Sequence, residues 1–196
     1  MTTTDTTTGR PMRADARRNY ERLLEAARAA FTEHGPDASL EDIARRAGVG
    51  AGTLYRHFPN RRALLEAVFR TRVEELCAEA DELLTHPSAR TGLAIWLRAV
   101  VLHSTTYRAL AASLMAAMLD EGSELTSACH DAMRAAGAAL LTRAQEAGEV
   151  RADVDISTVL RLVNAVAWAT EQTTGGASHI DRLLGVVTDG LRTPAG

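Results

Sequence analysis

Residues 39–62 have the sequence SLEDIARRAGVGAGTLYRHFPNRR, and this stretch decides the fold expected for the chain. Ser39 followed by Asp42 is a helix-start signature, because the serine oxygen can accept a hydrogen bond from an otherwise unpaired backbone N–H. Gly48 is expected to end this helix, and a second helix is expected from about residue 50 to residue 57. Two short helices joined by a tight turn predict a helix-turn-helix, whose second helix lies in the DNA major groove.

The expected second helix turns Leu54 and Phe58 toward the core and leaves a polar face for a partner. Small residues near its start allow close approach to base edges, and Thr53 offers a hydroxyl and a methyl group for reading them. The longer polar side chains can donate hydrogen bonds to phosphates. The residues that face outward or flank the contact are Ala51, Gly52, Thr53, Tyr55, Arg56 and His57. A solvated arginine face on an ordinary helical hairpin is the alternative interpretation.

The stretch GAGTLYRHFPNRRALL at 50–65, together with residues 39–48 and FTEHG at 31–35, resembles the DNA-binding domain of the TetR family of transcriptional regulators. The resemblance covers about residues 17–68. It implies that residues 50–57 form the recognition helix. It also implies that Tyr55, His57 and Arg61 contact phosphates, with Arg61 as a basic clamp at the start of the fourth helix.

The same resemblance implies that Gly52 and Thr53 approach the bases. The chain departs from the family's pattern at Gly50, where serine is frequent, and at Ala51, where a long polar side chain is frequent. The expected recognition helix therefore has a weaker cap and one fewer base-reading side chain. The full set of predicted DNA-binding residues is Ser39, Gly50, Ala51, Gly52, Thr53, Tyr55, Arg56, His57 and Arg61.

The net charge of −3 does not by itself suggest a nucleic-acid partner, but the charge is unevenly distributed. Residues 10–62 carry eleven Arg against seven Asp and Glu, a local charge of +4. Residues 63–196 carry eleven Arg against seventeen acidic residues, a local charge of −6. A basic N-terminal part joined to an acidic body fits a protein that binds DNA at one end.

Residues 1–16 are expected to form a disordered arm with a basic end, because the first nine residues are rich in threonine and lack apolar periodicity. Arg13, Arg17 and Arg18 are candidates for contacts with the DNA backbone or the minor groove. A solvated arm is the alternative. The helix-turn-helix domain is expected to span residues 17–62.

The remaining residues, 63–196, predict a larger helical domain for regulation and dimerisation. A fourth helix from about 61 to 84 links the two domains, so a shift in one domain can be transmitted to the other. Helices are expected at about 93–103 and 107–119, and no stretch alternates with a period of two. We therefore expect an all-α protein with about nine helices.

Several residues of the larger domain are candidates for a small-molecule pocket, because ligand sites are mostly apolar with a few polar groups. His103 is the polar candidate, since a histidine within an apolar helix needs a hydrogen-bond partner. For any one of these residues, ordinary core packing is the alternative. The candidates are Trp96, His103, Tyr107, Met115, Met118, Met133 and Trp168.

The last two expected helices, at about 155–174 and 178–191, each carry an apolar stripe. Two such helix pairs related by a two-fold axis would form a four-helix dimer interface. The alternative is that both stripes pack within one chain. The candidate interface residues are Val159, Val163, Val166, Leu183, Leu184 and Val187. The resemblance to the TetR family favours a homodimer, and residues 96–125, 144–154 and 182–192 resemble its SbtR-like subgroup of regulatory domains.

Cys77 and Cys129 are too few for a disulfide framework and predict free thiols. His103, Cys129 and His130 lack the spacing of metal ligands, so we expect no metal and no cofactor. The chain begins without an apolar signal core, and no apolar run approaches the length of a membrane span. We therefore expect a cytoplasmic protein with no membrane partner.

The leading hypothesis is a homodimeric transcriptional repressor that binds a palindromic double-stranded DNA operator and is released by a small-molecule effector. One alternative is a helix-turn-helix dimer without an effector pocket. The other is a helical enzyme with a docking domain, although no nucleophile–base pair, metal spacing or phosphate-binding loop supports an enzyme.

Overall fold

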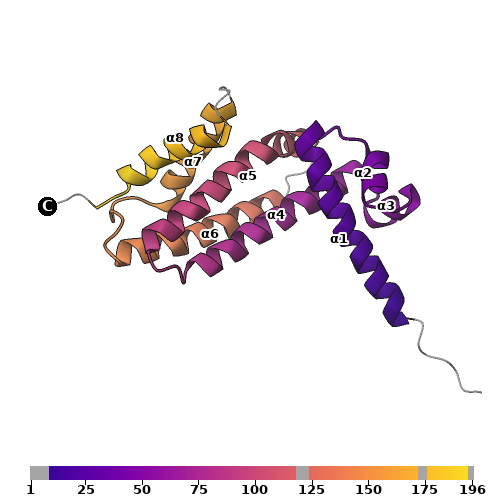
Figure 1. Cartoon of the computed structure of the whole chain (residues 1–196), viewed down its shortest axis with the longest axis horizontal. Coiled ribbons are helices and arrows are strands. Elements are labelled where there is room, and N and C mark those ends of the chain that lie inside the picture. Colours follow the sequence, from indigo (N-terminus) through magenta and orange to yellow (C-terminus); the bar gives the residue numbers. More distant parts are fainter. Residues whose placement is uncertain (1–8, 118–123, 172–175, 194–196) are drawn as a thin grey trace, which may run out of the picture. The chain divides into compact units, whose positions relative to one another are not determined.

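A computed structural model of the chain describes residues 9–117, 124–171 and 176–193. These residues form eight α-helices, and the only β-structure among them is an isolated bridge between Val150 and Arg192. The all-α class is confirmed. The helices are α1 (Gly9–His34), α2 (Leu40–Arg46), α3 (Ala51–His57), α4 (Arg61–Leu83), α5 (Ala89–Ala117), α6 (Glu124–Glu146), α7 (Ile156–Glu171) and α8 (Gly176–Gly190) (Figure 1).

The described residues contain eight helices, not about nine, because α5 is continuous where two helices were expected. Residues 104–106 are polar and lie between the two helices that were expected. Their hydroxyls are satisfied without unwinding the helix: Thr105 Oγ1 donates to the Leu102 carbonyl at 3.0 Å, and Ser104 Oγ donates to Asn164 Oδ1 on α7 at 3.0 Å. Serine and threonine side chains that find such partners are compatible with a helix interior.

The chain divides into two compact units, one of Met1–Phe69 with Ala109–Ala117 and one of Arg70–Arg108 with Met118–Gly196. The division falls at Phe69, within α4. In the first unit, α1 packs on α2 and α2 packs on α3. The buried side chains of this unit include Leu23, Ala27, Phe31, Ile43, Leu54, Phe58, Leu64 and Leu65.

The core of the second unit is built around Trp96 of α5, which is fully buried. Its indole Nε1 donates to the Leu76 carbonyl of α4 at 2.9 Å. Its ring packs against Gly137 of α6, where a Cβ would lie 2.6 Å from Cζ3 of the indole. Trp96 therefore joins α4, α5 and α6, and only glycine fits opposite the ring.

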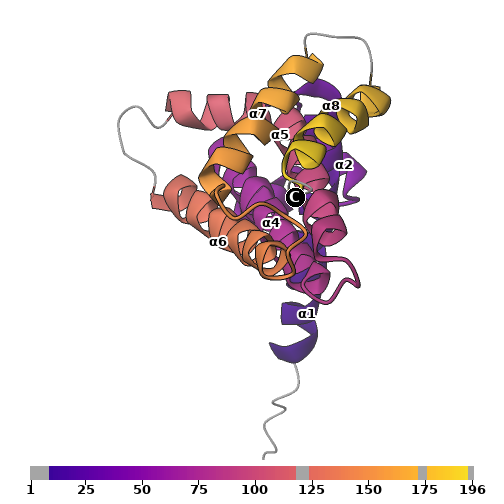
Figure 2. The same ribbon diagram turned by 90° about the vertical axis from the view of Figure 1, so that its left-hand side faces the viewer.

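The pair α7 and α8 packs side by side in the second unit (Figure 2). The end of α8 is tied to the loop between α6 and α7. Arg151 N donates to the Leu191 carbonyl at 2.9 Å, and Thr193 Oγ1 donates to the Gly148 carbonyl at 2.8 Å. These bonds hold the C-terminal helix on the core.

Glu149 secures the beginning of α5. Its Oε2 accepts hydrogen bonds from Arg90 N and from Ser88 Oγ, both at 2.9 Å. These bonds favour the ionised carboxylate and lower the pKa of Glu149 below its usual value.

Both cysteines are free thiols, as predicted. Within the described ranges, no group of three His, Cys, Asp or Glu residues could hold a metal ion. None of the described helices combines the length and apolar character that a membrane span requires.

Replacing Gly137 with alanine should lower the free energy of unfolding by about 1–3 kcal/mol, because the new methyl group would clash with Trp96. The matched control is Gly185→Ala on α8, where nothing lies within 4 Å of the added Cβ. The control should raise stability by about 0.5–1 kcal/mol, since alanine favours a helix over glycine. Urea denaturation measures both, and equal effects of the two variants would contradict the packing at Trp96.

Candidate nucleic-acid interface

The cap of α2 forms as its sequence signature predicts. Ser39 Oγ accepts a hydrogen bond from Asp42 N at 3.2 Å and donates to Glu41 Oε2 at 3.1 Å. Both acidic residues lie in the first turn, where the helix dipole favours negative charge. The Ser39 hydroxyl, which was predicted to be part of the DNA-binding surface, is thus engaged in capping α2.

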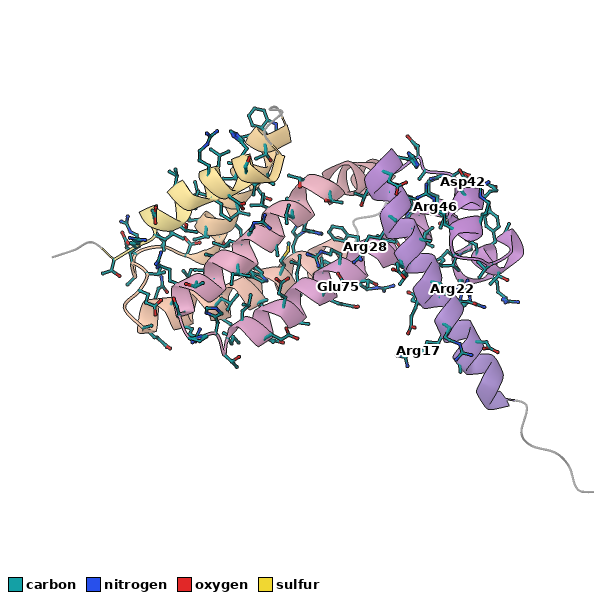
Figure 3. The ribbon with its side chains drawn as sticks, in the orientation of Figure 1. Arg17, Arg22, Arg28, Asp42, Arg46 and Glu75 are labelled. Atoms are coloured by element: carbon teal, nitrogen blue, oxygen red, sulfur yellow. The ribbon has the colours of Figure 1, made fainter. Side chains whose placement is uncertain are left out.

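The turn between α2 and α3 depends on Gly48, which has a φ of +65°. An ideal Cβ at this position would overlap Nη2 of Arg22, so the arginine of α1 lies directly over the turn (Figure 3). A second contact from α1 holds α2: Arg46 Nη1 pairs with Glu33 Oε2 at 2.7 Å. The α2–α3 pair is therefore fixed against α1 by polar contacts as well as by the apolar core.

Helix α3, the predicted recognition helix, has a buried face and an outward face. Leu54 is 1% exposed and Phe58, its C-cap, is 3% exposed. Gly50 is the N-cap and, as expected for glycine, makes no side-chain capping bond. On the outward face, Ala51, Gly52, Tyr55 and Arg56 are exposed, and Thr53 and His57 are half-buried. The predicted DNA-binding residues of α3 are thus brought together around one short helix.

An aromatic cluster that the sequence analysis missed anchors the end of α3 to α1. The ring centroid of Tyr20 lies 5.1 Å from that of Phe58 and 6.0 Å from that of His57. His57 Nε2 is buried and has no hydrogen-bond partner among the described residues. Tyr20 shares a helical apolar stripe with Leu23 and Ala27, a spacing that indicates burial but not the partner of the ring.

Arg61 was predicted to contact a phosphate. In this structure its guanidinium binds two backbone carbonyls. Nη1 donates to the Pro36 carbonyl at 2.8 Å and to the Ala38 carbonyl at 2.5 Å. Both acceptors belong to the loop between α1 and α2. The neighbouring Arg62 is exposed and pairs with Glu66 at 2.7 Å.

The predicted disordered arm is wrong for residues 9–16, because α1 already begins at Gly9. Ion pairs one turn apart support this early helical start. Arg18 pairs with Asp15, and Arg17 pairs with Glu21 at 2.9 Å. Such pairs stabilise a helix surface and reduce the free positive charge of the arm. The side chain of Arg13 lies outside the described residues.

Comparison with known proteins identifies the family of this chain. Residues 23–68 match the family model of bacterial regulatory proteins, tetR family, and residues 88–193 match the model of the SbtR-like transcriptional regulator C-terminal domain. The crystal structure of a TetR transcriptional regulator from Streptomyces coelicolor has 35% sequence identity to this chain and a TM-score of 0.78. The match covers 89% of this chain and 99% of that one. The chain belongs to the TetR family of transcriptional regulators.

Two further proteins are similar to this TetR-family regulator. The HTH-type transcriptional repressor KstR2 of Rhodococcus jostii is 27% identical over 189 residues, which cover 88% of this chain and 90% of the relative. The TetR-like regulator LfrR of Mycobacterium smegmatis, solved in complex with proflavine, shares the fold with a TM-score of 0.64. It is 21% identical, and the match covers 91% of this chain and 98% of that one. The protein is a DNA-binding transcriptional regulator and not an enzyme.

The pocket candidates that the structure describes differ in their exposure. Trp96 is fully buried and Met133 packs against the core, whereas Trp168 is 58% exposed and cannot line an enclosed pocket of a single chain. Met118 and the side chains of Tyr107 and Met115 lie outside the described residues.

His103 is the buried polar residue of the second unit, with 5% of its surface exposed. Burial lowers its pKa to about 4, and the nearby Arg72 and His130 add to this effect. Arg72 belongs to α4 and His130 to α6. At neutral pH the ring is uncharged, so one of its nitrogens can donate a hydrogen bond and the other can accept one.

Four of the six predicted dimer residues are buried within the chain's own core. Val159 and Val163 are fully buried, and Val166 and Leu184 are nearly so. Leu183 and Val187 are half-buried and pack against the same core. An apolar stripe shows which face of a helix is covered, but it does not show whether the same chain or a second copy covers it.

The large exposed apolar side chains of α7 and α8 lie at other positions. They are Leu162, Trp168 and Val186, with 46%, 58% and 71% of their surfaces exposed. A weaker second stripe at Leu162, Ala165 and Ala169, spaced by three and four residues, was the available sequence signal.

His103 should make the stability of the regulator depend on pH. Its pKa is about 4 in the folded state and 6.5 in the unfolded chain, so between these values the unfolded state binds more protons. The free energy of unfolding should therefore be unaffected above pH 6.5 and should decrease as the pH falls toward 4. His103→Phe should flatten this part of the urea-denaturation profile. His34→Phe, at an exposed end of α1, should keep it, and equal profiles for the two variants would contradict the assignment.

Proposed function

We propose that this TetR-family regulator is a repressor that binds a palindromic operator as a homodimer and leaves it when a small molecule binds the helical unit. The DNA-binding part of this proposal rests on the outward face of α3. Ala51 and Gly52 present little side-chain bulk at its first turn, and the turn at Gly48 fixes this helix to α2. A narrow, rigidly held helix fits the major groove.

Side chains suited to phosphates surround the small residues of α3. Tyr55 is 44% exposed, and Arg56 is exposed and forms no ion pair within the described part of the chain. A free guanidinium on the recognition helix can neutralise a phosphate, which releases counterions and supplies affinity without sequence preference. Thr53 is the residue of this face that we assign to base reading, because its hydroxyl and methyl group can distinguish base edges.

The assignment as a repressor is supported by the Rhodococcus jostii repressor, which matches along most of both chains. Release by an effector is supported by a fold relative whose structure holds proflavine. A ligand that binds the non-DNA conformation better by about 1–3 kcal/mol is sufficient to shift DNA binding. A helix-turn-helix dimer without an effector would bind DNA equally well in the presence of any ligand.

The homodimer is supported by the exposed apolar side chains of α7 and α8. An indole that is more than half exposed, close in sequence to exposed aliphatic residues, is typical of a surface that a partner covers. A second copy of the same chain is the partner that allows two recognition helices to meet two half-sites of a palindrome. We therefore assign Leu162, Trp168 and Val186 to the dimer interface.

Selection of bound sequences from a random DNA library should yield a palindromic operator. Arg56→Ala should weaken binding to all sequences and reduce the slope of log affinity against log salt by about 0.9 for each phosphate that the variant no longer neutralises. Thr53→Ala should instead change the preferred base at one position of each half-site. Arg134→Ala on α6, which also removes one arginine charge, is the control and should leave both properties unchanged. If Arg56→Ala behaved like Arg134→Ala, α3 would not be the DNA-binding helix.

Val186→Glu should convert the dimer to a monomer, because a charge would be buried in an apolar interface. Its side chain is 71% exposed in one chain, so the folded monomer can accommodate the change. The mass in solution from light scattering measures the effect. Thr142→Glu, at an exposed position of α6, should leave the dimer intact. A Val186→Glu protein with the wild-type mass would exclude this surface as the interface.

A further inference from the structure

Arg61 is the first residue of α4, and its side chain reaches back to the loop between α1 and α2. One nitrogen, Nη1, donates to two backbone carbonyls, that of Pro36 at 2.8 Å and that of Ala38 at 2.5 Å. The acceptors lie 25 and 23 residues earlier in the chain. Hydrogen bonds from a charged donor at such short distances are stronger than those between neutral groups.

These two hydrogen bonds form a bridge between the side chain of Arg61 and the loop. The two ends of the bridge lie at the two ends of the helix-turn-helix. Ala38 directly precedes Ser39, the N-cap of α2, and Arg61 follows α3 after only three residues. One side chain therefore connects the point where the chain enters the helix pair with the point where it leaves. The bridge closes the segment 38–61 and restricts how α2 and α3 can tilt on the core.

The local chemistry indicates that this bridge is the reason for an arginine at position 61. A cation in the first turn of a helix opposes the helix dipole, and α4 has no acidic residue in its first turn. The N-terminal cap is already supplied by Asn60, whose Oδ1 accepts a hydrogen bond from Ala63 N at 2.9 Å. Arg61 is also half-buried, so its charge requires acceptors, and the two loop carbonyls provide them.

We propose that Arg61 is a positioning residue for DNA recognition, which acts by holding the α1–α2 loop to the start of α4 rather than by neutralising a phosphate. This inference rests on the proposed DNA-binding function. The two roles differ in their dependence on salt, because a phosphate contact contributes about 0.9 to the slope of log affinity against log salt and an internal bridge contributes nothing.

The experiment compares Arg61→Ala and Arg61→Lys with Arg62→Ala, using the selected operator across a salt series and thermal unfolding of the free protein. Lysine keeps the charge but lacks the length and planar shape of the guanidinium. Both Arg61 variants should lose roughly tenfold in operator affinity, keep the wild-type salt slope and have a Tm lower by about 2–4 °C. Arg62→Ala removes an exposed charge and should keep the wild-type Tm.

A salt slope reduced by about 0.9 in Arg61→Ala, with affinity restored in Arg61→Lys, would overturn the proposal and assign Arg61 to a phosphate. Wild-type affinity in both Arg61 variants would overturn it as well. Binding of the wild-type protein is measured first. If it bound no DNA at low salt, the proposed function would fail, while an unchanged Tm in Arg61→Ala would separately disprove the bridge.

Discussion

The left-handed backbone at Gly48 is the constraint on which the DNA-binding unit depends. A residue with a Cβ would be strained at its φ of +65° and would also displace the guanidinium of Arg22. With glycine in place, the chain reverses within a few residues, and Leu54 reaches the core while the first turn of α3 remains outside. The small, open face of the recognition helix is thus a consequence of one backbone conformation and of the arginine that covers it.

The second unit is organised by contacts around an aromatic side chain. Trp96 bonds to a carbonyl of α4 and packs on the bare backbone of Gly137, so three helices are held at close distance. The pair α7 and α8 contributes one apolar face to this core and leaves other apolar side chains exposed. In the proposed homodimer, this division of faces lets one helix pair stabilise its own chain and also contact a second copy.

The sequence predicted the helix-turn-helix well because its signals are local. The cap at Ser39, the glycine after α2 and the apolar spacing of α2 and α3 each depend on residues a few positions apart, and the structure shows them as expected. The resemblance to the TetR family rested on the same residues. The continuity of α5 was missed because the partner of Ser104 is Asn164, a contact with another helix that has no local signature.

The features that the sequence could not supply are those that only tertiary structure decides. The stripe at Val159 and Val163 was correctly seen as apolar, but its covering partner could not be read from spacing. The acceptors of Arg61 are backbone carbonyls, which carry no residue-type signal, so the sequence offered only the family's phosphate role for that arginine. The exposure of Trp168 was missed for the same reason as the burial of the valines, since both depend on how α7 is rotated on the core.

The affinity of the wild-type protein for the DNA immediately upstream of its own gene, measured across a salt series against random DNA, tests the central claim most directly. Our account predicts tight binding that weakens steeply as salt increases and that stays far above the binding to random DNA at every salt concentration. Equal binding to both DNAs would place the operator elsewhere and require the library-selected sequence in the same assay. Failure to bind any DNA at low salt would contradict the account.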